Sequence, residues 1–98
     1  MPSRSYVRGR RAEYEAMEHL VMQGFQVARM AGSHGPFDLV AIGPQTVKLV
    51  QVKSGELDAF ELRRARERLA PIPAPACVVK ELWLRVRGGW QIEVLNGP

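Results

Sequence analysis

Two short stretches decide the fold and the chemistry of this chain: Phe37-Asp38-Leu39-Val40-Ala41-Ile42 and Val50-Gln51-Val52-Lys53-Ser54. Both are rich in apolar and β-branched residues, which is typical of buried strands. Each also carries polar residues that a buried strand tolerates only when they are paired, coordinated to a ligand or used in chemistry. The turn Gly43-Pro44-Gln45 between them is too short for a crossover helix, so we predict an antiparallel hairpin.

The polar side chains of this hairpin are predicted to meet on neighbouring strands. Asp38 offers a carboxylate and Gln51 a side-chain carbonyl, and both are hard oxygen ligands for a divalent cation. Lys53 follows Gln51 by two residues, so both point to the same face of a strand. Glu13 lies on the apolar stripe of a helical segment, four residues before Met17. We predict that Glu13, Asp38 and Gln51 hold a metal ion, and that Lys53 joins these three as catalytic residues of a metal-dependent phosphodiesterase.

Hydrophobic periodicity predicts an α/β protein with two helices and six strands. The helices are expected at about 9–23 and 57–69, and the strands at 25–31, 37–42, 46–52, 76–79, 82–86 and 90–95. Gly24 is expected to end the first helix, and Asp58 or Ser54 to cap the second. We predict one domain over residues 1–98, with a basic arm at 1–8 and a proline-rich linker at 71–75.

The composition describes a small globular domain with a basic bias: 98 residues, 46% of them hydrophobic, and a net charge of +4. The single Cys77 excludes an intrachain disulfide and fits a reducing cytoplasm, where we expect the protein to work, and Cys77 itself is expected to be buried. No apolar stretch approaches the ~20 residues needed to cross a bilayer, so we expect no membrane partner. The arginines that crowd the start suit a polyanion such as nucleic acid, with a solvated basic terminus as the alternative.

Four motifs occur in order over roughly residues 6–55: Tyr6-x-Arg8-Gly9-x-x-Ala12-Glu13, Gly24-Phe25-x-Val27-x-Arg29-x-Ala31-Gly32-Ser33, Phe37-Asp38-Leu39-Val40-Ala41 and Val50-Gln51-Val52-Lys53. Together they resemble the archaeal-type Holliday junction resolvases, called Hjc, of the PD-(D/E)xK nuclease superfamily. The resemblance implies a restriction-endonuclease-like fold, in which α-helices flank a central mixed β-sheet. It also implies a homodimer that cuts four-way DNA junctions with Mg²⁺, for which Mn²⁺ is expected to substitute.

The resemblance also assigns residues. Glu13, Asp38 and Lys53 match the family's helix glutamate, strand aspartate and lysine. The family normally has glutamate where this chain has Gln51, whereas Mrr-like restriction nucleases of the same superfamily carry glutamine there. Arg29 and Ser33 match residues that contact DNA, and the basic N-terminus adds further candidates. The predicted DNA-binding residues are therefore Arg8, Arg10, Arg11, Arg29 and Ser33.

Two alternatives stay open at this point. The first keeps the chemistry but changes the substrate to flap, nicked or duplex DNA. The second is a non-catalytic DNA-binding module in which Gln51 has disabled the metal site. For the homodimer, we predict an interface formed by the apolar strands and the tryptophans of residues 76–95.

Overall fold

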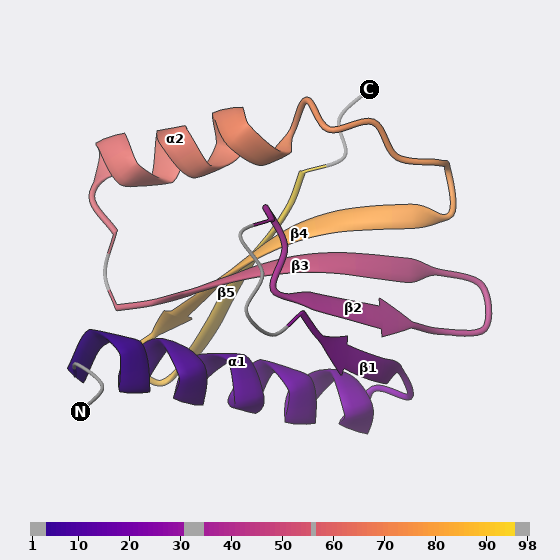
Figure 1. Ribbon diagram of the computed structural model, residues 1–98, viewed down its shortest axis with the longest axis horizontal. Helices are drawn as coiled ribbons and strands as arrows, with labels where there is room; N and C mark the ends of the chain where they lie inside the picture. The colour runs from indigo at the N-terminus through magenta and orange to yellow at the C-terminus, as the bar shows by residue number, and fades with distance from the viewer. Residues whose placement is uncertain (1–3, 31–34, 56, 96–98) are drawn as a thin grey trace.

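The apolar segments form five strands and two helices in a computed structural model that describes residues 4–30, 35–55 and 57–95 (Figure 1). In chain order the elements are α1 (Arg4–Met22), β1 (Gln26–Arg29), β2 (Leu39–Ile42), β3 (Val47–Ser54), α2 (Ala59–Leu69), β4 (Val78–Val86) and β5 (Gly89–Val94). No helix in the described ranges is both long and apolar enough to cross a membrane.

The strands form one mixed sheet in the order β1-β2-β3-β4-β5. The predicted hairpin is confirmed, because β2 and β3 are antiparallel and Leu39 lies opposite Val50. In contrast, β3 and β4 are parallel, and α2 forms the crossover between them. The α/β fold with a mixed sheet flanked by helices is therefore the one that the sequence predicted.

Each face of the sheet is covered by one helix. On one face, α1 buries small and aliphatic side chains against the sheet, with Ala16, Leu20 and Trp83 fully buried. On the other face, Leu69 of α2 packs with Leu82 and Phe37. Removing a leucine-sized side chain from water contributes about 1.5–3 kcal/mol, so these two clusters hold both helices against the sheet.

The helix ends follow the predicted signals, but the first helix starts earlier than expected. Gly24 adopts a φ of 98°, and the Phe25 N–H donates to the Leu20 carbonyl over 3.1 Å, which closes α1. The Asp58 carboxylate caps α2 by accepting from the Glu61 N–H over 2.8 Å. Since α1 begins at Arg4, residues 4–8 of the predicted basic arm are helical, whereas the sequence placed the start of the helix at about residue 9.

The two strands predicted at 76–79 and 82–86 are wrong as separate elements, because β4 runs through Lys80 and Glu81 without a break. Both side chains are buried and paired. The Lys80 Nζ donates to the Leu69, Ala70 and Ile72 carbonyls over 3.0, 2.6 and 2.5 Å, which satisfies the end of α2. The Glu81 carboxylate accepts from the Trp83 indole over 2.9 Å.

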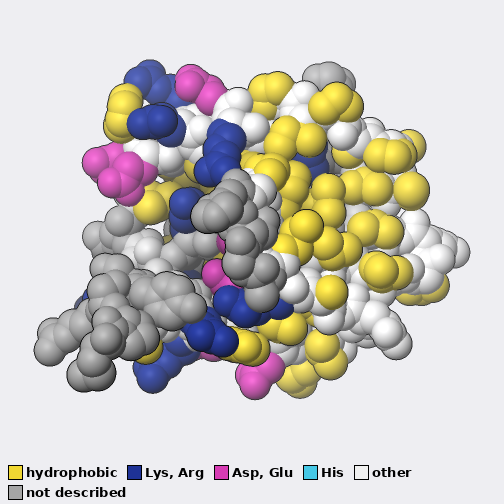
Figure 2. Space-filling model, viewed as in Figure 1, with side chains coloured by type: hydrophobic (Ala, Val, Ile, Leu, Met, Phe, Trp, Pro, Cys, Tyr) yellow, Lys and Arg dark blue, Asp and Glu magenta, His cyan; other side chains and the backbone are white. Residues whose placement is uncertain are grey.

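On the face of the molecule that Figure 2 shows, basic and apolar side chains gather in different halves. Figure 2 shows Lys and Arg side chains over α2, over the space between the helices and over α1 on the left of the view, and hydrophobic side chains on the right. The apolar end of the sheet is formed by the β2–β3 turn and the proline-rich segment, and its exposed residues include Ile42, Pro44, Pro73, Pro75 and Cys77. The prediction that Cys77 is buried is therefore wrong, because this residue precedes β4 instead of lying inside it.

Candidate active site

A notch in the sheet lies beside β3, because β2 ends before β3 does. The pairing between β2 and β3 ends at Leu39 and Val50, whereas β3 continues along β4 as far as Ser54. Backbone groups of β3 beyond Val50 therefore have no β2 strand beside them. Asp38, which immediately precedes β2, fills this position and places its side chain against β3.

The Asp38 carboxylate is fixed by two donors from β3. Its Oδ2 atom accepts from the Val52 N–H and from the Gln51 Nε2, both over 2.8 Å. The pKa of Asp38 is raised above its ordinary value, first because burial disfavours the charged form. The Val52 N–H opposes this rise, the Glu13 carboxylate adds to it, and the cationic Lys53 and Arg29 oppose it more weakly.

Gln51 and Lys53 point to the same side of β3, as the strand alternation predicts, and both line a cavity below α2. The Gln51 side chain is buried, and its amide nitrogen, rather than its carbonyl oxygen, faces Asp38. To bind a cation through its oxygen, Gln51 must turn its amide group over. Lys53 is half-buried and lies near enough to Asp38 to lower the pKa of that carboxyl.

Glu13 reaches the same site from the other face of the sheet. Its carboxylate acts electrostatically on Asp38, which places two acids at the notch. Arg29 of β1 holds the Glu13 Oε1 at 2.9 Å from its Nε, and the Arg29 guanidinium also lies 5.5 Å from the centre of the Tyr14 ring. The helix α1, the residue that precedes β2 and the strand β3 thus bring Glu13, Asp38, Gln51 and Lys53 together.

A sequence model of the PD-(D/E)XK endonucleases matches residues 4–68, which include all of these side chains. The chain belongs to the PD-(D/E)XK endonuclease family. Its fold is similar to that of Hjc, a Holliday junction resolvase from the archaeal hyperthermophile Archaeoglobus fulgidus, with 25% identity and a TM-score of 0.66 over 89% of this chain and 72% of the other. No curated protein matches the sequence.

PD-(D/E)XK endonucleases act on DNA and generally use divalent metal ions, and the donors at the notch fit such an ion. Asp38 and Glu13 bring two carboxylates, and Gln51 has an amide oxygen. Because burial and mutual repulsion penalise the charge of Asp38, a nearby cation would stabilise the ionised site. Within the described ranges no group of three His, Cys, Asp or Glu side chains is placed to hold a metal, so a metal at the notch would need the Gln51 amide oxygen in addition to the two carboxylates.

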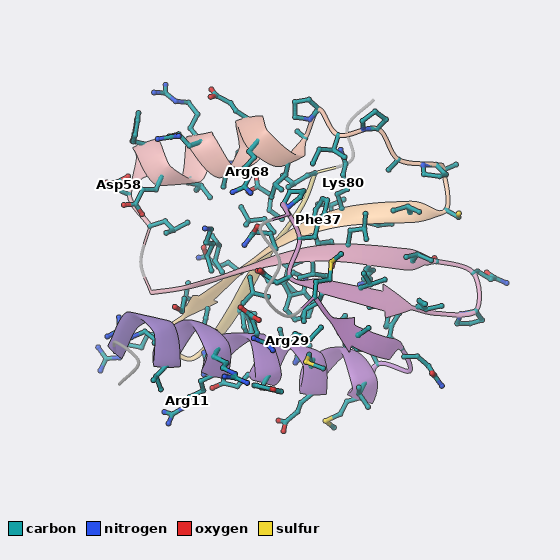
Figure 3. The ribbon with its side chains drawn as sticks, in the orientation of Figure 1. Arg11, Arg29, Phe37, Asp58, Arg68 and Lys80 are labelled. Carbon is teal, nitrogen blue, oxygen red and sulfur yellow. The ribbon has the colours of Figure 1, made fainter. Side chains whose placement is uncertain are left out.

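Three of the five predicted DNA-binding residues, Arg8, Arg10 and Arg29, lie on or beside the elements that border the notch. The Arg8 guanidinium lies beside Gly55, the residue that directly follows β3. Its Nη1 would be 4.0 Å from a Cβ atom placed on Gly55. The Arg10 guanidinium lies 6.0 Å from the centre of the Tyr14 ring, which is the ring that Arg29 also contacts. Figure 3 shows Arg11 directed away from the sheet and Arg29 between α1 and the strands.

Of the two labelled arginines, Arg29 therefore lies on the sheet side of α1 and Arg11 does not. Ser33, the remaining predicted DNA contact, lies outside the described residues. The DNA-binding roles of all five residues remain predictions.

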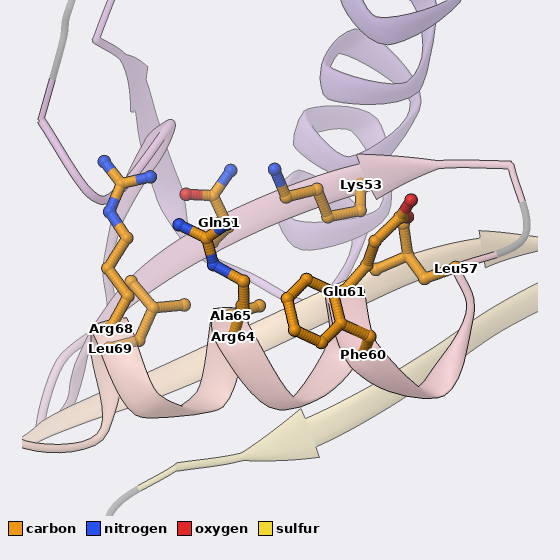
Figure 4. Close-up of a pocket in the computed structure, with 9 residues that line it drawn as sticks. All are labelled: Gln51, Lys53, Leu57, Phe60, Glu61, Arg64, Ala65, Arg68 and Leu69. Carbon is orange, nitrogen blue, oxygen red and sulfur yellow. The ribbon is translucent and has the colours of Figure 1, made fainter.

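The sequence leaves the arginine run at 63–68 open between a solvated face and a phosphate track, and it does not assign Arg64 and Arg68 of α2 to the site. Figure 4 shows their guanidinium groups pointing toward Gln51 across the cavity that Lys53 also lines. Phe60, Arg64 and Arg68 are spaced four residues apart and therefore share one helix face. This spacing was the available signal, but only the packing of α2 on the sheet shows that the shared face borders the active site.

Proposed function

We propose that this chain is a Mg²⁺-dependent nuclease that resolves four-way DNA junctions, with Mn²⁺ able to replace Mg²⁺. The observation that carries the proposal is the fixed position of Asp38, whose Oδ2 accepts from both Val52 and Gln51 beside the Glu13 and Lys53 charges. The similarity to the archaeal Hjc resolvase supports a junction as the substrate.

In this proposal, Asp38, Glu13 and the turned amide of Gln51 hold the cation. A divalent cation bound there would neutralise charge on the scissile phosphate and lower the pKa of a water molecule. Lys53, which shares its strand face with Gln51, orients the attacking water and stabilises the negative charge that develops on phosphorus. Arg29 keeps the Glu13 carboxylate turned toward the notch through its ion pair.

The substrate is tested with a four-way junction, a nicked duplex, a flap and a linear duplex that carry the same sequences. We expect paired symmetric cuts near the junction centre in Mg²⁺ or Mn²⁺, slower cutting of the other substrates, and none with a chelator. Equal cutting of all four DNAs would replace junction resolution with general nuclease activity. Binding without cutting in either metal would favour the non-catalytic DNA-binding module.

We also propose a homodimer, but with a different interface from the one predicted by the sequence. Trp83 is fully buried and cannot anchor a partner, whereas Trp90 is half-buried against the same core cluster and offers only part of its surface. Ile42 is 54% exposed and lies at the apolar end of the sheet, where Val40 and Leu49 are half-buried. A second copy placed on this surface would leave the basic half free for DNA.

For the dimer, we expect light scattering of the wild type at about 100 µM to give twice the chain mass of 11.0 kDa. Ile42→Asp places a charge in the apolar interface and should give the single-chain mass. Val94→Asp is the matched control, because Val94 is similarly exposed, at 57%, on the edge strand β5 and should remain dimeric. A wild-type monomer, or equal effects of both substitutions, would contradict this interface.

As a location we propose the cytoplasm, because the lone Cys77 has an exposed thiol that is compatible with a reducing compartment.

A further inference from the structure

A cavity of about 450 Å³ lies between β3 and α2, directly beside the candidate active site (Figure 4). Gln51 and Lys53 form its wall on the strand side, and the Gln51 amide also donates to Asp38, so the cavity borders the notch. Leu57 and Leu69 contribute apolar surface. The volume lies in the range of small-molecule pockets and is larger than a phosphate group alone requires.

The charges around the cavity favour an anion. Lys53, Arg64 and Arg68 line it, and Glu61 is the acid among its lining residues. The outer arginines of the same helix are already paired, Arg63 with Glu67 at 4.0 Å and Arg66 with Glu93 at 2.7 Å. In the described part of the chain, neither Arg64 nor Arg68 forms an ion pair with a carboxylate. The inner pair therefore remains available for a phosphate.

An aromatic ring stands at the same cavity. Phe60 is 57% exposed although it is large and apolar, and it lines the cavity one helical turn before Arg64. The Arg64 guanidinium lies 5.8 Å from the centre of the Phe60 ring. An exposed ring beside unpaired arginines is the combination with which proteins bind unpaired nucleotides, because the ring stacks on the base and the cations hold the backbone.

We propose that this cavity binds one unpaired nucleotide of the cleaved strand, next to the phosphate that is cut. Arg64 and Arg68 hold its backbone phosphate, and Phe60 stacks against its base. The proposal rests on the nuclease function of the adjacent notch and extends it to substrate choice. A linear duplex keeps its bases stacked, whereas the centre of a junction releases a nucleotide at low cost. The cavity therefore selects branched DNA.

The test compares two double variants that remove the same charge from the same helix. Arg64→Ala with Arg68→Ala changes the inner pair, and Arg63→Ala with Arg66→Ala is the matched outer control; all four side chains are exposed. Both are made in the Asp38→Asn background, so that binding is measured without cleavage. Circular dichroism and thermal unfolding establish that each variant is folded.

Binding is measured by fluorescence anisotropy of a labelled four-way junction and of a linear duplex. We expect substitution of the inner pair to raise the Kd for the junction about tenfold. The number of counterions released on binding, obtained from the salt dependence of the Kd, should fall by about two. The outer pair should change the Kd less than about twofold. Phe60→Leu, which keeps apolar volume without a ring, should weaken junction binding severalfold and leave duplex binding unchanged.

The outcomes separate this inference from the nuclease proposal. Equal effects of the inner and outer pairs would overturn the nucleotide site even if the wild type cleaves junctions. Equal loss of junction and duplex binding on Phe60→Leu would overturn the stacking role of Phe60. A wild type that cleaves nothing, combined with a selective effect of the inner pair, would keep the nucleotide site and overturn the nuclease proposal.

Discussion

Asp38→Asn is expected to reduce single-turnover cleavage of a four-way junction by at least about a thousandfold. The substitution keeps the shape of the side chain, so its oxygen can still accept from the Val52 N–H, but it removes the anionic ligand. Binding of the junction should persist or tighten, because the candidate phosphate contacts are arginines on other elements and the change removes a negative charge. Cleavage near the wild-type rate would contradict the assignment of Asp38.

The same variant has an expected effect on stability that does not require DNA. Because the pKa of Asp38 is raised in the folded protein, its ionisation costs stability as pH rises through and above the ordinary carboxyl value of 3.8. Without metal at pH 7, Asp38→Asn should therefore unfold at a higher temperature than the wild type, and the difference should shrink as the pH falls below 3.8. A lower unfolding temperature at pH 7 would contradict this reading of the site.

Mg²⁺ should stabilise the wild type and have little effect on Asp38→Asn, because a ligand stabilises only the folded state that binds it. The metal requires the ionised carboxylate, so this stabilisation should weaken as Asp38 becomes protonated at low pH. The difference is measured as the unfolding temperature of each protein in Mg²⁺ and in metal-free, chelator-treated buffer. Equal Mg²⁺ shifts in both proteins would place the metal elsewhere.

Gln51→Glu is expected to preserve or raise cleavage and to lower the Mg²⁺ concentration that gives half-maximal activity. A carboxylate binds a hard cation more strongly than an amide does, and it needs no rotation to present an oxygen. Without metal, the new charge would lie against the Asp38 carboxylate that Gln51 now contacts at 2.8 Å. The metal-free protein should therefore be less stable than the wild type, and Mg²⁺ should raise its unfolding temperature by a larger increment.

Gln51→Leu is the matched loss-of-function variant, since it keeps the buried side-chain size but has no oxygen ligand. It also removes one of the two donors to Asp38 and leaves the Val52 N–H. We expect cleavage to fall by about a hundredfold or more, in line with the loss of a group that supports transition-state charge. Activity equal to that of the wild type would place Gln51 outside the site.

A third pattern would identify an inactive nuclease. In that case the wild type would be inert in Mg²⁺ and Mn²⁺, and Gln51→Glu would create cleavage where none existed. Isothermal titration of the wild type would then show no metal binding. The orientation of Gln51 is compatible with this pattern as well. Gln51 presents its amide nitrogen, and not its oxygen, to Asp38, so it does not offer a metal ligand in this orientation.

The sequence by itself determined the local structure around the notch. The short turn after Ile42 and the apolar runs on either side define the antiparallel hairpin, and strand alternation places Gln51 and Lys53 on one face. The stripe on the first helix identified Glu13 as a residue that reaches the sheet. These features depend on neighbours in the chain and on a fixed periodicity, so the pattern of residues is sufficient to predict them.

Only the tertiary structure decided which polar groups from distant segments pair with one another. Lys80 and Glu81 read as a break between strands, yet β4 is continuous because the end of α2 and the Trp83 indole provide their partners. The candidate role of Arg64 and Arg68 likewise depends on how α2 packs across β3. A buried charge is tolerated or used according to the groups that surround it, and those groups come from parts of the chain that periodicity does not connect.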